Sequence, residues 1–450
     1  MPVVTVVGAS GDILPITVHG AAADSFAQLY AATLNDIAFG GGLVAADLTP
    51  GQSPPPVPAG AVGEGVILTP GTFNVPAGYS FVTIAADKPV TLNEAAAVAP
   101  TSVLAGLGGT TLYGGPAGGF FIAGGGNNLF SGGQGNYVVA TGAGNDSIYG
   151  GLGSDLIEDG AGHNQVNTGA GNDAVFSQGT DLITLGSGNS DVTLTGSNST
   201  VSSSTGASTI TDKGTGTQFL GGPAATIVLA GQNGTYSFSG NATVSGGEND
   251  TIAAAGNTTV FGGVNTTVFQ NGNGSLAFIA TTGHSATVGG GGASASVRGA
   301  DGSDITFLGS AGTNTLAAMA GSETLDGGLS TGALDLIGGR GNASLIGGSG
   351  ADTLAAGSGS DTLTGGAGAN VFSFTSGSGG QTTITDFGTA SGNLVALIGY
   401  GANAAQAALS TAVNTGNGGS VITLGRSTTI TFLDLTADQL KAHSGQFTSH

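Results

Sequence analysis

The sequence predicts an all-β fold: a parallel β-roll or β-helix solenoid built from nine-residue repeats. The first observation is a regular pattern over residues 141–176, which divides into the blocks TGAGNDSIY, GGLGSDLIE, DGAGHNQVN and TGAGNDAVF. Each block has Gly at its fourth position, Asp or Asn at its sixth, and a β-branched apolar residue at its eighth. The second observation is the composition, with 89 Gly, no Trp and 7% charged residues. An ordinary globular core needs more large side chains, whereas one solenoid coil buries only one or two.

The repeat also predicts where oxygen ligands meet. The apolar segment of each block is strand-like and the flanking glycines are turn-like. If one block forms half a coil, blocks two apart stack on the same edge, which brings Asp146 to Asn164 and Asp155 to Asp173. Calcium takes six to eight oxygen ligands in irregular geometry, so side-chain oxygens and turn carbonyls together suit it better than magnesium or a transition metal.

This pattern, G-G-x-G-x-D-x-U-x with U a large apolar residue, resembles the calcium-binding repeat of RTX (repeats-in-toxin) proteins. The resemblance implies a parallel β-helix that folds with calcium outside the cell. Because the ion would offset repulsion between stacked carboxylates, we expect folding and calcium binding to be coupled. A metal-free solenoid that uses Asp and Asn only to form turns is the alternative.

A second cluster of repeats follows at residues 338–373, with the blocks GGRGNASLI, GGSGADTLA, AGSGSDTLT and GGAGANVFS. Asp352 lies opposite Asn370 in this frame, whereas Asp361 lies opposite Ala343. The calcium site at Asp361 would therefore be weaker or would use Asn342 as a ligand. The predicted calcium ligands of both clusters are Asp146, Asp155, Asn164, Asp173, Asp352, Asp361 and Asn370. Between the clusters acids are sparse, and the pattern leaves open whether any of three bind ions: Asp250, Asp304 and Glu323.

The chain is expected to have three parts. Residues 1–100 form a small, mainly β N-terminal domain with one helix at 21–39, predicted from apolar residues near helical spacing, and a Pro-rich linker at 40–60. We expect this helix to cap the open end of the solenoid or to dock another subunit. The solenoid occupies residues 101–373.

Residues 374–450 are predicted to form a β-rich C-terminal cap with a short helix near residues 437–442. This tail resembles the end of RTX proteins exported by type I secretion, in which an Asp-Phe segment, here Asp386-Phe387, precedes an uncleaved C-terminal signal. The resemblance implies export in one step, unfolded, with folding triggered by calcium outside. The first residues lack the pattern of a secretory signal, and no apolar run is long enough to span a membrane.

The net charge of −21, from 27 acidic and six basic residues, excludes a basic stripe for nucleic acid or anionic membrane. The sequence has no Cys and therefore no disulfide or thiol chemistry. It contains no H-E-x-x-H zinc motif. The single G-x-S-x-G lies at 328–332 inside a slip of the repeat, and Arg298 and Arg340 are isolated, so no catalytic residues are predicted.

These observations predict a secreted, non-enzymatic structural protein. A calcium-stabilised solenoid would self-associate, head to tail, into a filament, surface layer or biofilm matrix. A second hypothesis is an adhesin or ice-binding solenoid, with a cell-surface polysaccharide as a candidate partner of the adhesin, and the Thr pairs at 258–259 and 266–267 as a sign of Thr rows. A third is a polysaccharide-active β-helix enzyme.

Overall fold

The structure is a computed structural model that describes residues 2–309, 312–425 and 427–450. Met1, Ser310, Ala311 and Arg426 lie outside the described residues. The chain divides into two compact units, residues 1–227 and 228–450. The division falls within strand β22 (Thr226–Leu229).

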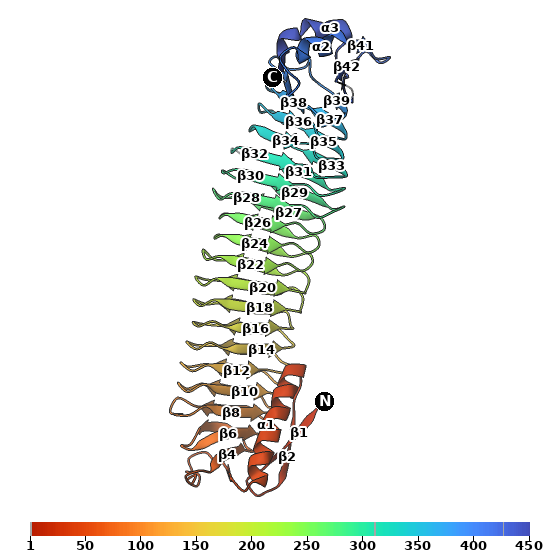
Figure 1. The fold of residues 1–450 in the computed structure, drawn as a ribbon. Helices are drawn as coiled ribbons and strands as arrows, with labels where there is room; N and C mark the ends of the chain where they lie inside the picture. Colours follow the sequence, from red (N-terminus) through yellow and green to blue (C-terminus); the bar gives the residue numbers. More distant parts are fainter. Residues whose placement is uncertain (1, 310–311, 426) are drawn as a thin grey trace. The chain divides into compact units, whose positions relative to one another are not determined.

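The first unit is a stack of coils whose strands pair in parallel with the strands of the next coil (Figure 1). One sheet, called sheet 1, contains β3 (Leu43–Asp47), β4 (Val62–Ile67), β6 (Tyr79–Ile84), β8 (Thr101–Ala105), β10 (Gly119–Ala123), β12 (Tyr137–Ala140), β14 (Leu156–Gly160), β16 (Ala174–Ser177), β18 (Ser190–Leu194) and β20 (Ser208–Asp212). The facing sheet, sheet 2, contains β5 (Gly71–Asn74), β7 (Val90–Asn93), β9 (Thr110–Tyr113), β11 (Leu129–Ser131), β13 (Ser147–Tyr149), β15 (Gln165–Asn167), β17 (Leu182–Leu185), β19 (Thr200–Ser203) and β21 (Gln218–Gly221).

The core of this unit is a pair of apolar columns, one from each sheet. The eighth-position residues of the repeats all point inward and are almost completely buried, as the sequence pattern predicts. Because strand side chains alternate between faces, each coil contributes only one residue per sheet to a given column. The column from sheet 1 is Val103, Phe121, Val139, Ile157 and Val175, and that from sheet 2 is Leu112, Phe130, Ile148, Val166 and Ile183.

The predicted helix is present as α1 (Ala21–Phe39), but the expectation that it caps the end of the solenoid is wrong. Together with the antiparallel hairpin of β1 (Val3–Val7) and β2 (Ile13–Thr17), it lies along the outer face of sheet 1, over strands from β3 to β14 (Figure 1). The reason is a match of apolar surfaces. The buried stripe of α1 packs against outward-facing apolar residues of three coils, Leu104, Ile122 and Ala140.

A buried polar chain fixes this helix to the sheet. The Tyr30 hydroxyl lies 3.0 Å from the Thr83 hydroxyl, which donates a 2.8 Å hydrogen bond to Glu64 Oε1. Glu64 is fully buried, and burial raises its pKa to about 7.

The segment predicted as a linker, residues 40–60, instead forms the first strand of the solenoid and a loop that packs against its first coils. Strand β3 lies within it, and the side chain of Leu48, which follows β3, is buried against the inward-facing Gly65. The Tyr79 hydroxyl donates a 2.9 Å hydrogen bond to the Pro55 carbonyl, which ties down the Pro-rich loop. A Pro-rich segment has few backbone N–H donors, so it can pack on the first coils without leaving many buried donors unpaired.

The second unit repeats the same two-sheet arrangement. Its part of sheet 1 contains β24 (Ala242–Ser245), β26 (Thr258–Phe261), β28 (Leu276–Ile279), β30 (Ala295–Arg298), β32 (Asn314–Ala317), β34 (Leu334–Ile337), β36 (Thr353–Ala355), β38 (Val371–Thr375), β40 (Leu394–Ile398) and β44 (Phe447–Ser449). Its part of sheet 2 contains β23 (Thr235–Phe238), β25 (Thr251–Ala254), β27 (Thr266–Gln270), β29 (Ser285–Gly289), β31 (Asp304–Leu308), β33 (Ser322–Asp326), β35 (Asn342–Ile346), β37 (Ser360–Thr364), β39 (Gly380–Ile384) and β43 (Thr428–Phe432).

The C-terminal end of this unit is closed by an antiparallel extension and two short helices. Strands β42 (Ser420–Leu424) and β41 (Val413–Asn414) continue sheet 2 beyond β43, and α2 (Ala404–Ser410), α3 (Ala437–Ala442) and the 3-10 turn η1 (Ser444–Gln446) cover the last coil (Figure 1). The Phe of the predicted Asp-Phe segment is fully buried. Its ring contacts three other Phe rings and so seals the core: Phe372, Phe432 and Phe447.

The all-β solenoid predicted from the sequence is therefore confirmed, but its predicted boundaries at residues 101 and 373 are not. Parallel coil strands already begin at β3 and continue through β40 and β44. The early coils were missed because their turns, unlike the later ones, lack the Gly and Asp spacing that marks a repeat.

Candidate metal centre

Six of the seven predicted ligands lie in turns, Asp361 lies at the start of β37, and all seven are buried. They also share one contact. The Oδ1 atom of each accepts a backbone N–H, at 2.7 to 2.9 Å, from the residue 18 positions earlier in the chain, in the coil below. The sixth position of the repeat therefore joins successive turns, as a side-chain continuation of the backbone ladder.

The stacking predicted from the repeat is present on both edges of the first unit. On the edge before sheet 2, the Asp146 backbone N–H donates to Asn164 Oδ1 at 2.9 Å. On the edge before sheet 1, the Asp155 N–H donates to Asp173 Oδ1 at 2.9 Å. The two pairs that the sequence placed together thus lie together, one on each edge.

The glycines of these turns allow the coils to approach closely. At Gly162, which has a φ of 144°, an added Cβ would collide with the carbonyl oxygen of Gly144. Gly144 in turn stands over the carbonyl of Gly126. Only Gly fits where the backbone of one turn lies directly on the carbonyl of the turn below, and this packing lines the turns with backbone oxygens.

The first cluster contains carboxylate oxygens that no protein group satisfies. The Oδ2 atoms of Asp146, Asp155 and Asp173 are buried and have no hydrogen-bond partner. The sequence has no Lys or Arg between Lys88 and Lys213, so this cluster has no local basic residue as counter-ion. Burial raises the pKa of all three carboxyl groups, that of Asp155 to about 7. Unpartnered buried oxygens of this kind are costly unless a proton or a cation neutralises them.

The second cluster differs in this respect. Asp352 accepts a second N–H, from Gly348, on its Oδ2 atom, and Asp361 accepts one from Gly357, both at 2.8 Å. Burial raises the pKa of both groups here as well. The carboxylates of the second cluster are therefore held by backbone donors on both oxygens, and the first cluster has the more open ligand set.

Among the described residues, no three acidic or histidine side chains are grouped so that they alone could hold a metal ion. A calcium ion in these turns must therefore take most of its six to eight oxygens from turn carbonyls and water. The stacked glycine carbonyls and the unpartnered Oδ2 atoms are hard oxygen donors, so the residues present fit calcium. When bound, the ion would supply the positive charge that the turns lack.

Several other buried polar residues lie at comparable positions; most were not among the predicted ligands, and the sequence left Glu323 open. Asn128 and Asp181 extend the Asp146 column by one coil on either side, and Asp181 escaped the pattern because the coil that precedes it has 17 residues rather than 18. On the other edge, Tyr137 occupies a sixth position and donates a 3.0 Å hydrogen bond to the buried Glu94. In the second unit, Glu323 has one unpartnered oxygen and accepts the Met319 N–H on the other.

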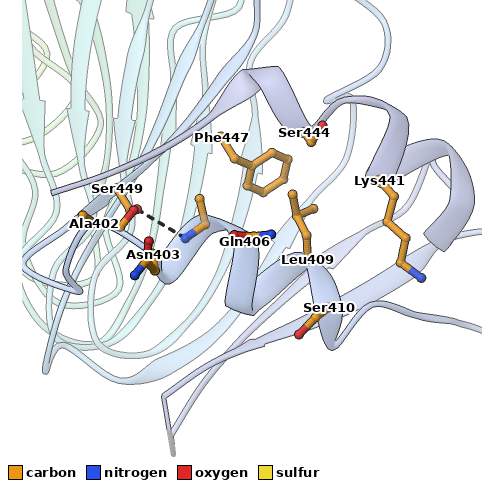
Figure 2. Close-up of a pocket in the computed structure, with 10 residues that line it drawn as sticks. Ala402, Asn403, Gln406, Leu409, Ser410, Lys441, Ser444, Phe447 and Ser449 are labelled. Atoms are coloured by element: carbon orange, nitrogen blue, oxygen red, sulfur yellow. Dashed lines mark hydrogen bonds between the residues drawn. The ribbon is translucent and has the colours of Figure 1, made fainter.

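A pocket in the second unit offers no comparable chemistry. It has a volume of about 580 Å³ and lies among α2, α3 and the C-terminal strand β44 (Figure 2). Lys441 is the one charged residue in its lining, which otherwise consists of uncharged polar residues, two alanines, Leu409 and Phe447. Its lining has no acid–base pair or activated nucleophile.

The fold and the turns together define a class: a glycine-rich β-solenoid whose stacked turns contain buried, uncompensated carboxylates. The particular family follows from comparison with known proteins. Residues 140–175, 299–331 and 337–378 match the RTX calcium-binding nonapeptide repeat, in four copies. The chain therefore contains RTX calcium-binding nonapeptide repeats, and repeats of this kind bind Ca²⁺. A search of curated proteins finds no match.

The matched segments cover about a quarter of the chain. Two of them coincide with the clusters predicted at 141–176 and 338–373, and the third includes Asp304 and Glu323. Proteins with these repeats are typically exported by type I secretion. Among the described residues, no helix is both long enough and apolar enough to cross a bilayer.

Proposed function

We propose that this protein is a secreted, non-enzymatic structural protein whose calcium-stabilised solenoid assembles head to tail into an extracellular filament, surface layer or biofilm matrix. The observation that carries the proposal is the open edge of sheet 1 in each unit. Coil strands use most of both units, so little of the described chain remains for a separate catalytic domain.

The first open edge belongs to β3, which among the described residues pairs only with β4. The Gly42 carbonyl and the Leu48 N–H both bond to the β4 side. Because backbone groups alternate along a parallel strand, the N–H of Ala45 points to the other side. An unpaired row of this kind is a template for another strand.

The second edge belongs to β44, which among the described residues pairs as a strand only with β40, in parallel, while α2 contacts it through the Ala405 N–H and the Ser449 hydroxyl. All strands of sheet 1 run in the same direction within each unit. The β3 strand of a second copy, placed beside β44, would therefore extend the sheet as a further parallel strand. Contacts of this heterologous kind do not close on themselves and produce fibres.

Export fits the same scheme. The RTX repeats supply calcium-dependent turns, and the buried carboxylates of the first cluster oppose folding where calcium is scarce. A chain that stays unfolded inside the cell and folds in a calcium-rich exterior would expose its β3 and β44 edges only where assembly is useful.

The test is electron microscopy and sedimentation of the full chain, with calcium and after chelation. Wild type is expected to form filaments or sheets only with calcium. Ala45→Pro removes one outward N–H from β3 and leaves the ladder to β4 intact, so it should fold with calcium but stay a single particle. Ser53→Pro, in the exposed loop after β3, is the matched control and should assemble. A calcium-loaded wild type that remains monomeric at high concentration would refute the proposal.

A second candidate function, surface binding as an adhesin or ice-binding protein, is favoured by one observation. The Thr pairs noted in the sequence lie on different sheets, and each joins a column in its own sheet. The longer column, on the outer face of sheet 2, contains five threonines in register, at about 4.8 Å spacing: Thr235, Thr251, Thr267, Thr287 and Thr306. Thermal hysteresis and adhesion of the wild type, compared with Thr267→Lys, test this function.

A further inference from the structure

One repeat of the first cluster exchanges the residues at two of its positions. In the blocks that begin at 141 and 168 the first position is Thr and the sixth is Asp. In the block DGAGHNQVN the first position is Asp159 and the sixth is Asn164. The carboxylate that the repeat pattern places at the sixth position has moved five residues towards the N-terminus, within the same turn.

Asp159 is held in the interior of the turn. It has no exposed surface, and its backbone carbonyl accepts a 2.7 Å hydrogen bond from the Thr141 hydroxyl in the coil below. Its Oδ1 atom receives only a long 3.4 Å bond from the Gln178 N–H of the coil above. It also lies at an irregularity in the register between β14 and β16, where an extra residue turns the chain.

Two buried oxygens beside this turn have no partner. The Oδ2 atoms of Asp159 and Asp146 are both unsatisfied, although both side chains are almost completely buried. The nearby Asp181 raises the pKa of Asp159 through its charge and a side-chain hydrogen bond, so it adds negative charge to the turn. Its Oδ2 already accepts the Ser177 hydroxyl and the Gly179 N–H.

The charges in this region repel one another. Burial raises the pKa of Asp159 well above its usual range, and the neighbouring charges of Asp181 and Asp146 raise it further. The only histidine in these turns, His163, is exposed and lies at a variable repeat position. The turn therefore contains a surplus of negative charge and no side chain that neutralises it.

We propose that Asp159 and Asp146 bind one divalent cation between them, with calcium as the metal, in a site that uses the first position of the repeat in place of the missing sixth-position acid. Hard carboxylate oxygens favour calcium over softer metals. Turn carbonyls and water complete its coordination, because two carboxylates alone do not fill its shell. This inference concerns one ion in the first cluster and does not depend on self-assembly.

The experiment counts calcium ions bound by the full-length chain. Protein stripped with a chelator is titrated with calcium chloride, and the number of ions is measured by calorimetry and native mass spectrometry. Asp159→Asn should bind one ion fewer than wild type. The matched control is Asp191→Asn, which makes the same charge change on an exposed residue of the same unit, and it should bind the wild-type number.

A second variant protects the test against misfolding. Asp159→Thr places at this position the residue found in the neighbouring blocks, so it is compatible with the turn. It should also lose one ion, and in chelator it should unfold at the same or higher urea concentration than wild type, because a buried charge has been removed. If either folded variant retains the full number of ions, the proposed site is refuted. If wild type binds no calcium at all, it is the RTX assignment of the first cluster that fails.

Discussion

A sixth-position Asp performs two separable tasks in this protein. Its Oδ1 atom accepts a backbone N–H from the coil below, and its Oδ2 atom, in the first cluster, is unpartnered and available to a metal. Because the two tasks belong to different atoms, two substitutions of Asp146 should change the stability of the protein differently.

Asp146→Ala removes the acceptor of the Asn128 N–H. Because it leaves a buried donor unpaired, it should lower the free energy of unfolding by about 1–3 kcal/mol with or without calcium. Asp146→Asn keeps the acceptor and removes only the charge, so it should lower stability in calcium and leave it equal or higher in chelator. Urea unfolding under both conditions measures this. Equal losses for both variants in chelator would contradict the division of tasks.

The turn glycines give a second prediction at this scale. Gly162 combines a positive φ with a carbonyl of the coil below at the place of a Cβ. Gly162→Ala should therefore cost on the order of 1–3 kcal/mol from backbone strain alone, and more from the collision with that carbonyl. Gly445→Ala, at a glycine with open space around it, is the control and should leave the thermal midpoint unchanged.

At the scale of the element, the two repeat clusters have the same sequence pattern but differ in how their turns are held. In the second cluster the backbone donors Gly348 and Gly357 already satisfy the Oδ2 atoms that are left free in the first. The second cluster should therefore contribute to folding even without calcium, whereas the first should depend on the ion.

The corresponding variants make this measurable. In Asp352→Asn the side-chain NH₂ group faces a backbone N–H, so two donors meet and at least one of them loses its acceptor. The substitution should therefore lower the free energy of unfolding by about 1–3 kcal/mol in chelator. Asp155→Asn removes a charge whose Oδ2 has no partner, so it should cost little or nothing in chelator and lose stability only in calcium. The opposite order of effects in chelator would refute the distinction between the clusters.

Coil length is a further feature of the element that the repeat pattern did not reveal. Over residues 235–270, in the first coils of the second unit, strands of adjacent coils pair at a spacing of 16 residues, as in Thr235 with Thr251. The shorter turns place Asn233, Asn249 and Asn265 in the left-handed region, with φ values of 54°, 57° and 53°. Asn tolerates this region better than other side chains. Side-chain amides of these residues form a ladder with bonds of 3.3 and 3.0 Å. The recurrence of Asn every 16 residues in the sequence could have predicted these shorter coils.

At the scale of the whole molecule, buried acids determine how stability changes with pH. Burial raises the pKa of Asp155 and Glu64 to about 7 and that of Glu94 to about 8. Since these pKa values are higher in the folded than in the unfolded chain, the folded state binds more protons between about pH 4 and 8. Stability without calcium is therefore present at the acidic end of this window and is lost as the pH rises through the folded pKa values.

We expect the midpoint of urea unfolding in chelator to fall from pH 5 to pH 8. Saturating calcium should flatten or reverse this trend, because the ion replaces the proton at carboxylates of the first cluster such as Asp155. Glu64, beneath α1, should keep its proton dependence with calcium present. A midpoint in chelator that rises with pH over this range would show that these acids are ionised and paired in the folded state.

Much of this protein was determined by its sequence alone. The nine-residue period predicted the parallel solenoid and the inward direction of the eighth-position residues. Side chains alternate between the two faces of a strand, and the Gly turns recur at a constant spacing, so residues at the same repeat position stack from coil to coil. The period also placed Asp146 with Asn164 and Asp155 with Asp173. The helix at 21–39 followed from its own apolar spacing.

Only the tertiary structure decided what those elements contact. The position of α1 depends on outward-facing residues such as Leu104 and Ile122, which look like core residues in the sequence. Residues 40–60 belong to the solenoid and are not a linker because Leu48 packs against Gly65. Whether a repeat Asp has a free oxygen, as Asp155 has and Asp361 lacks, depends on the turn backbone around it. A local pattern specifies which residues share an edge, whereas contacts between coils specify which of their atoms remain unsatisfied.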